Sequence, residues 1–271
     1  MKKCVFSLIV AAIAVMFAAC ANLEIKSDGL DGCQDVCCVD DTLFATNMAT
    51  SNPLDYKSKE GSVVAVVSGE AVNYLAPDGS MSVPKGIAAI GNYIYVADFQ
   101  RVHVINRTTK HKFAMPLPSE DYYANDIVVV GDMLLLSVTN NGHILALDLN
   151  ADGSPQISGF QLLTTVIGAS AMCYATDRLF IASYSDEPAN ENVLYVIDNF
   201  DLPEAKVFLS RQGGYRGLTA DDQYLYFSDV NINTLGRVSL TDTADVSYIE
   251  TPHSAPSNGI VLCENTIFAT H

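Results

Sequence analysis

Positive charge is scarce in this chain. Its 271 residues include 15 lysines and arginines against 31 aspartates and glutamates, which gives a formal net charge of −16. Nucleic acids and anionic membrane surfaces are bound by basic surfaces, because the bound phosphate groups must be neutralised. The composition therefore argues against nucleic acid as a partner. An acidic excess of this size is typical of an exported protein that its charge keeps soluble.

Helical periodicity is missing after the first twenty residues. The rest of the chain holds short apolar runs separated by turn residues, which is the pattern of β-strands. The one long apolar run, residues 5–18, is too short to cross a bilayer comfortably. The sequence therefore predicts an all-β protein with an apolar leader.

The leader has the features of a secretion signal. Two lysines precede the apolar run, and residues 17–20 read Phe-Ala-Ala-Cys. These four residues resemble the lipobox of bacterial lipoproteins, which implies cleavage before Cys20 and a lipid anchor on that cysteine. Because Ala21 follows the cysteine, the resemblance implies retention in the outer membrane. The alternative is ordinary cleavage at the Ala-Cys-Ala site of residues 19–21. We expect residues 1–19 to be the signal peptide.

Six ungapped copies of one thirteen-residue pattern make up most of the remaining chain. Each copy has an apolar second position, an aliphatic ninth and a small twelfth, with turn residues between its two apolar stretches. Each copy therefore predicts a strand, a tight turn and a second strand. Successive copies start 40 to 51 residues apart, the length of one β-propeller blade. The copies span residues 35–47, 86–98, 126–138, 171–183, 217–229 and 259–271.

Third and fourth strands follow the first five copies, whereas the sixth copy ends the sequence. Residues 22–26 could lend this last blade a closing strand. We therefore expect a six-bladed β-propeller over residues 35–271, with five complete four-stranded blades and an incomplete sixth, preceded by a tether at residues 20–34. Because the sixth blade is incomplete, we also expect that the sequence is a truncated version of a longer chain.

Five cysteines follow the one expected to carry lipid. Cys33, Cys37 and Cys38 lie within six residues, and we expect one disulfide among them, with its pairing left open. Cys173 occupies the third pattern position and is expected to be a small buried residue. A zinc site is the alternative use of the cysteines, but no Cys-x-x-Cys pair or neighbouring histidine supports it.

Residues 84–98 resemble an NHL repeat, and they resemble equally the blades of the gluconolactonase and senescence marker protein family. Residues 257–270 repeat the likeness. The resemblance implies a propeller but is compatible with enzymes, binders and scaffolds. In the lactonases a glutamate, two asparagines and an aspartate just before the inner strands hold a divalent metal in the channel. The matching ring in this chain is Gln34, Lys85, Asn125, Ser170, Arg216 and Asn258.

This ring matches the lactonase metal site only in part. Asn125 and Asn258 fit the family's asparagines, but nothing in the ring supplies the two acids, and its lysine and arginine oppose a cation. We therefore favour no metal or other cofactor. The alternative is a divalent cation such as calcium, held by these asparagines together with Asp35 and Asp126 if both aspartates turn inwards.

The same ring suits an anionic or carbohydrate-like ligand better. Lys85 and Arg216 would supply charge, and Asn125, Ser170 and Asn258 would supply hydrogen bonds. The competing interpretation is that both cations pair with nearby carboxylates and only shape the entrance of the channel.

No catalytic constellation accompanies this ring. The five histidines share no blade position and no nucleophile partner, so a Ser-His-Asp or Cys-His site has no support. A fold-level likeness to streptogramin lyases offers no place for the catalytic histidine and glutamate of that group. The sequence thus predicts an exported, lipid-anchored propeller that binds a small molecule or a protein, and it leans away from an enzyme. The alternative is a metal-dependent hydrolase of the gluconolactonase type.

Overall fold

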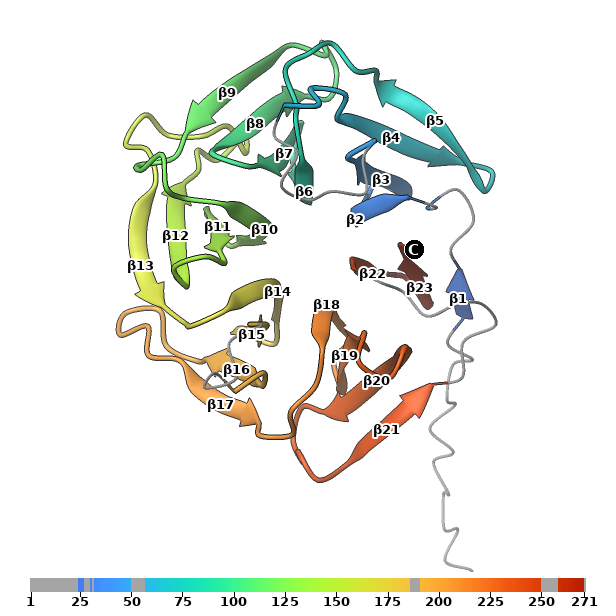
Figure 1. Cartoon of the computed structure of the whole chain (residues 1–271), viewed down its shortest axis with the longest axis vertical. Helices are drawn as coiled ribbons and strands as arrows, with labels where there is room; N and C mark the ends of the chain where they lie inside the picture. The colour runs from blue at the N-terminus through green and yellow to red at the C-terminus, as the bar shows by residue number, and fades with distance from the viewer. Residues whose placement is uncertain are drawn as a thin grey trace, which may run out of the picture.

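The computed structural model describes residues 24–26, 30, 32–49, 57–185, 191–249 and 258–270. The regular elements of these residues are all β-strands, and they form six sheets arranged radially around one axis (Figure 1). The predicted all-β six-bladed propeller is therefore confirmed. Within the described residues, no helix is long and apolar enough to cross a membrane.

Five of the sheets are four-stranded and antiparallel, with the strands in chain order from the axis outwards (Figure 1). Blade 1 contains β2 (Cys33–Val39), β3 (Thr42–Asn47), β4 (Ser62–Val67) and β5 (Glu70–Leu75). Blade 2 contains β6 (Pro84–Ile90), β7 (Tyr93–Asp98), β8 (Arg101–Asn106) and β9 (Lys112–Pro116). Blade 3 contains β10 (Ala124–Val130), β11 (Met133–Val138), β12 (His143–Asp148) and β13 (Gln161–Thr165). Blade 4 contains β14 (Ala169–Ala175), β15 (Arg178–Ser183), β16 (Leu194–Ile197) and β17 (Lys206–Leu209). Blade 5 contains β18 (Tyr215–Ala220), β19 (Tyr224–Asp229), β20 (Thr234–Ser239) and β21 (Val246–Ile249).

The sixth blade has three strands in the described residues. Here β22 (Ile260–Cys263) pairs with β23 (Thr266–Ala269), and β1 (Glu24–Lys26) adds to β23 in parallel, with Ile25 opposite Ile267. The segment expected to lend a closing strand thus does so over the residues that the structure describes. The ring is closed by pairing the two ends of the propeller, which leaves fewer open strand edges.

The small twelfth residue of the pattern is fully buried in all six copies. In four copies it carries a hydroxyl, and we call Thr46, Ser137, Ser228 and Thr270 the hydroxyl bridges. Each accepts a hydrogen bond from a backbone N–H of its own blade and donates one to a backbone carbonyl of the next blade. The bridges therefore join neighbouring inner strands directly around the axis.

The disulfide lies elsewhere than predicted. Cys38 on β2 is bonded to Cys263 on β22, so the bond joins blade 1 to blade 6. The expected bond among Cys33, Cys37 and Cys38 is wrong. Cys37 and Cys38 are successive strand residues that point to opposite faces of the sheet, and Cys33 lies four residues or more away along the same extended strand, too far to bridge either of them. Cys173 is half-buried, less enclosed than predicted.

Candidate functional site in the central channel

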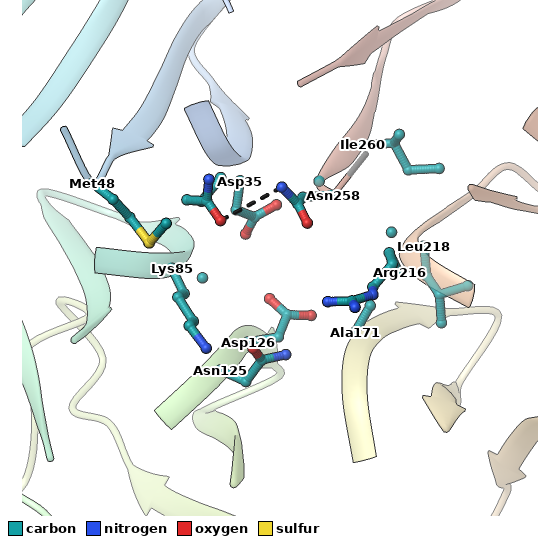
Figure 2. Close-up of a pocket in the computed structure, with 14 residues that line it drawn as sticks. Asp35, Met48, Lys85, Asn125, Asp126, Ala171, Arg216, Leu218, Asn258 and Ile260 are labelled. Carbon is teal, nitrogen blue, oxygen red and sulfur yellow. Dashed lines mark hydrogen bonds between the residues drawn. The ribbon is translucent and has the colours of Figure 1, made fainter. Parts of the chain in front are cut away.

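Five of the six predicted ring residues line one cavity on the propeller axis (Figure 2). Its volume is about 290 Å³, at the lower end of the range for small-ligand sites. The ring residues come from the starts of inner strands in five different blades, so residues far apart in the sequence converge. They are Gln34, Lys85, Asn125, Arg216 and Asn258.

A β-bulge at the start of the inner strand places these side chains. In blade 1 the register runs from Cys33 opposite Asn47 to Val36 opposite Ala45, which leaves two residues of β2 against one of β3. The same shift occurs in blades 2 to 5. A bulge re-aims the side chains of its extra residues, and here it turns most of them towards the channel. In blades 1 to 5 the ring residue and the first pattern residue occupy this bulge.

Ser170 is the ring residue that the structure does not bring to the cavity. Its side chain is buried, and its hydroxyl donates to the carbonyl of Ala182 at 3.1 Å. Its own carbonyl accepts the hydroxyl bridge from Ser137 at 2.6 Å. Ser170 is thus part of the joint between blades 3 and 4, and the predicted ligand-binding role does not follow from its position.

Lys85 and Arg216 extend into the cavity from opposite sides (Figure 2). Both are half-buried, and neither forms an ion pair with any residue that the structure describes. Burial and the charge of Arg216 lower the pKa of Lys85. Two half-buried cations that face one small cavity and have no ion-pair partner among the described residues are costly, and an anion between them would relieve this cost.

The guanidinium of Arg216 lies on an aromatic ring. Its central carbon is 3.8 Å from the ring centroid of Tyr184, just after β15 in blade 4, a cation–π contact. Its Nε is buried and has no hydrogen-bond partner among the described residues. The Tyr184 ring packs against the flat face of the Arg216 guanidinium group. The Nε–H on the edge of this group still has no hydrogen-bond acceptor among the described residues.

Asp35 and Asp126 also line the cavity, as the alternative prediction of a divalent cation site required. Their oxygens are already engaged by backbone N–H groups. Asp35 accepts from Ile87 at 2.9 Å, whereas Asp126 accepts from Ile127 at 2.7 Å and from Met172 at 2.5 Å. Like the hydroxyl bridges, these two carboxyl groups tie one blade to the next.

Both carboxyl groups hold their protons more tightly than usual. Loss of water contact, followed by the nearby Asp126 carboxylate, raises the pKa of Asp35 well above its ordinary value. Burial raises the pKa of Asp126 to about 7. Two interacting carboxyl groups in such a site cannot both ionise freely, so near neutral pH the pair carries less than its full charge.

These residues fit a divalent metal poorly. Among the described residues, no group of three or more histidine, cysteine or acidic side chains is placed to hold a metal ion. The side-chain amide of Asn258 donates to Gln34 at 3.5 Å, and both aspartates are engaged by backbone. A hard cation needs several available oxygens and negative charge, and this ring adds two positive charges instead.

Comparisons with known proteins identify the fold. No family model matches the sequence, and no curated protein matches it. An inactive variant of virginiamycin B lyase from Staphylococcus aureus with quinupristin superposes with a TM-score of 0.60 at 13% identity, covering 90% of this chain and 79% of that one. A selenomethionine form of the lyase gives 0.57 at 16%, with 83% and 72% covered. A nidogen/laminin complex gives 0.61 at 17%, with 86% and 83% covered. At these identities the likeness shows the propeller fold alone.

No histidine lines the channel cavity in the part of the chain that the structure describes. The lyase crystallised with quinupristin is inactive because one of its histidines is replaced by alanine. Here the described histidines, His103, His111 and His143, lie on blades 2 and 3 and do not line the channel cavity. His253 and His271 lie outside the described residues. The described part of the cavity thus offers binding groups and no histidine.

Proposed function

We propose that the channel cavity binds a small anionic, sugar-like ligand. The observation that carries the proposal is the pair Lys85 and Arg216, which face one cavity and have no ion-pair partner among the described residues. A carboxylate or phosphate placed between them would accept charge-assisted hydrogen bonds from both. The buried Nε of Arg216 supplies a further donor.

The other groups in the cavity favour a ligand rich in hydroxyls. Gln34, Asn125 and Asn258 present side-chain amides, each of which can donate and accept. A protonated carboxyl of the Asp35 and Asp126 pair can also donate. This mixture suits a sugar acid better than a simple inorganic anion. A binding module is favoured over a metal-dependent hydrolase because both carboxyl groups are committed to the backbone.

The proposal is tested by calorimetric titration of the mature chain with gluconate and glucuronate, and with glucose as the uncharged comparison. We expect the acids to bind and glucose to bind at least about tenfold more weakly. The Lys85→Ala/Arg216→Ala variant should lose the acids. Lys206→Ala is the matched control, because it removes an exposed cation paired with Asp198 on blade 4. Equal binding of the acids by the double variant would exclude this site.

We further propose that the protein is exported and anchored by lipid at Cys20 in the outer membrane. The leader and its lipobox support this proposal, and so does the Cys38–Cys263 bond, since disulfides persist in oxidising compartments. In a bacterial host, labelled palmitate should be incorporated into the wild-type chain and not into Cys20→Ala. The variant should leave the membrane fraction. Membrane retention of an unlabelled Cys20→Ala chain would contradict the anchor.

A further inference from the structure

A second cavity, separate from the channel, is lined by several of the chain's few positively charged residues. It is a groove of about 550 Å³ between blades 1 and 2. Four of the chain's 15 basic residues line it, although the chain has 31 acidic residues and none of the described ones lines this groove. We call it the basic groove. Its four cations are Lys57, Lys59, Arg101 and Lys112.

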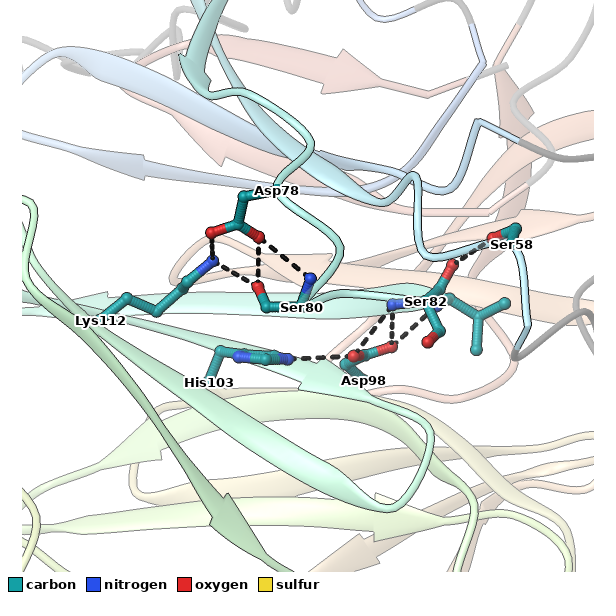
Figure 3. Close-up of polar contacts among 8 residues, drawn as sticks. Ser58, Asp78, Ser80, Ser82, Asp98, His103 and Lys112 are labelled. Atoms are coloured by element: carbon teal, nitrogen blue, oxygen red, sulfur yellow. Dashed lines mark hydrogen bonds and ion pairs between the residues drawn. The ribbon is translucent and has the colours of Figure 1, made fainter.

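The loop that carries Lys57 and Lys59 is tied to blade 2, whose strands carry Arg101 and Lys112, by a partly buried chain of polar contacts (Figure 3). The carboxylate of Asp98 accepts from the backbone of Ser82 and of Val83, the latter at 2.7 Å, and it contacts His103 Nε2 at 3.0 Å. The Ser58 hydroxyl donates to the carbonyl of Ser82 at 3.1 Å. The groove is therefore held in shape before any ligand arrives, which lowers the entropic cost of binding.

The buried histidine beneath the groove is peculiar to this blade. The register places His103 opposite Val96, and the equivalent positions of the other complete blades are Val64, Leu145, Tyr195 and Gly236. Four of the five blades thus use an apolar, aromatic or small residue where blade 2 uses a histidine paired with a buried aspartate. The fold alone does not require this pair.

One cation of the groove is oriented by its neighbours. Lys112 Nζ contacts Asp78 Oδ2 at 2.7 Å and also donates to the Ser80 hydroxyl (Figure 3). Lys59 and Arg101 are exposed and form no ion pair within the described residues. The groove therefore offers one positioned ammonium group and two cations that an anionic ligand can engage without displacing a described carboxylate.

An aromatic ring forms the outer wall of the groove. Phe113 on β9 is 42% exposed, lies beside the exposed Ala114, and has the His111 ring 6.3 Å away. Exposed aromatic rings provide flat apolar contact area, and the C–H face of a sugar ring has the matching shape. Cations and hydroxyls such as that of Ser80 would meet the acidic and hydroxyl groups on the edge of the same sugar.

We propose that the basic groove binds an anionic oligosaccharide that carries uronate or sulfate groups. A short ligand is favoured because the net charge of −16 would repel a long polyanion beyond the groove. A sugar is favoured over a bare anion because Phe113 faces the same cavity as the cations. This site is independent of the channel and stands whether or not the channel binds its own ligand.

The test is titration of the mature chain at low salt with tetragalacturonate and a chondroitin sulfate tetrasaccharide, which separate uronate from sulfate recognition. Cellotetraose is the neutral comparison, inorganic sulfate the bare anion and hexaglutamate the acidic peptide. The Lys59→Ala/Arg101→Ala variant changes two exposed side chains and should fold normally. We expect it to lose at least about tenfold in affinity for an acidic tetrasaccharide, and Phe113→Ala also to bind more weakly.

Two controls place the site. Lys206→Ala removes one exposed cation from blade 4, and Lys110→Ala removes an exposed cation of blade 2 that does not line the groove; neither should change binding of the tetrasaccharide. Added salt should weaken the wild-type affinity. The proposal is overturned if neither acidic tetrasaccharide binds, if the groove variants bind as well as wild type, or if hexaglutamate or sulfate alone binds as tightly with the same dependence on the groove.

Discussion

Cys38 and Cys263 are 225 residues apart in the sequence and form the disulfide that joins blade 1 to blade 6. Their Cα atoms are 6.0 Å apart, between strands β2 and β22 at the seam where the propeller closes. The same seam carries the pairing of β1 with β23. Within the described residues, closure of this ring thus rests on one covalent bond, one short parallel strand pair and the hydroxyl bridge from Thr270 to the carbonyl of Gln34.

The disulfide should contribute strongly to stability. Because it closes a loop of more than two hundred residues, its removal restores a large conformational entropy to the unfolded chain, worth about 5 kcal/mol in the loop-closure model. The Cys38→Ala/Cys263→Ala variant should unfold at a markedly lower urea concentration. Reductant should shift the wild-type midpoint and leave that of the variant unchanged. Equal midpoints for wild type and variant would show that the bond adds nothing.

The hydroxyl bridges make a second contribution. In Ser137→Ala the backbone N–H of Asp126 and the carbonyl of Ser170 both lose a buried partner, so we expect a loss of about 1–3 kcal/mol. Ser210→Ala is the control, because this serine is exposed. Chemical denaturation of both variants measures the difference. A loss no larger than that of the control would mean that water replaces the bridge.

Much of the fold could be predicted because its signals are local. Alternating apolar residues and the turn residues between them, as in residues 86–98, specify a strand pair without reference to the rest of the chain. The disulfide could not be predicted, because Cys38 meets Cys263 only after the ring has closed. Nearness in sequence favoured a bond among Cys33, Cys37 and Cys38, but all three lie on the single strand β2.

The sequence predicted where the residues of the candidate site lie in each blade. It did not predict how their side chains are oriented. Counting from the pattern found Lys85 and Arg216 because the bulge recurs at the same place in each blade. It could not show that Ser170 turns into the joint between blades, since its hydroxyl has a backbone partner within reach. Nor could it show the ring of Tyr184 under Arg216, which comes from a neighbouring blade.

The two channel cations, Lys85 and Arg216, should lower the stability of the folded protein. Lys85 is half-buried near the like charge of Arg216, so Lys85→Met should leave the free energy of unfolding unchanged or raise it by up to about 1 kcal/mol. Arg107→Met is the contrasting variant, because it breaks an ion pair with Asp40 at 2.8 Å, and it should be slightly destabilising. Urea unfolding compares the two. A large loss in Lys85→Met would mean that the lysine has a structural partner.

Calcium should not stabilise this protein. Because two cations share the cavity and both aspartates are engaged by backbone, we expect the thermal midpoint to be the same in excess calcium and in chelator. Differential scanning fluorimetry measures this directly. A calcium-dependent rise in the wild type that disappears in Asn125→Ala would restore the metal site and with it the hydrolase alternative, which lactone hydrolysis would then test.

The aspartate pair should make stability fall as the pH rises. The pKa of Asp35 is raised well above its ordinary value, and that of Asp126 is raised to about 7, so the folded protein binds more protons than the unfolded chain in this range. The contribution of the pair is therefore complete below about pH 4 and is lost as the pH rises towards about 7. Other groups also titrate in this pH range, so the quantity to measure is the difference in the free energy of unfolding between wild type and variant.

Asp126→Asn isolates this effect, because an amide keeps the shape of the protonated acid and cannot ionise. The loss of one backbone hydrogen bond lowers its stability by an amount independent of pH. Relative to wild type, the variant should gain on the order of 1–2 kcal/mol between about pH 5 and about pH 8, a figure reduced for the partial solvent access of the site. Asp222→Asn, an exposed turn residue, should show no such gain. Parallel pH profiles for wild type and Asp126→Asn would mean that Asp126 is ionised throughout this range, and the channel would then carry its negative charge beside Lys85 and Arg216.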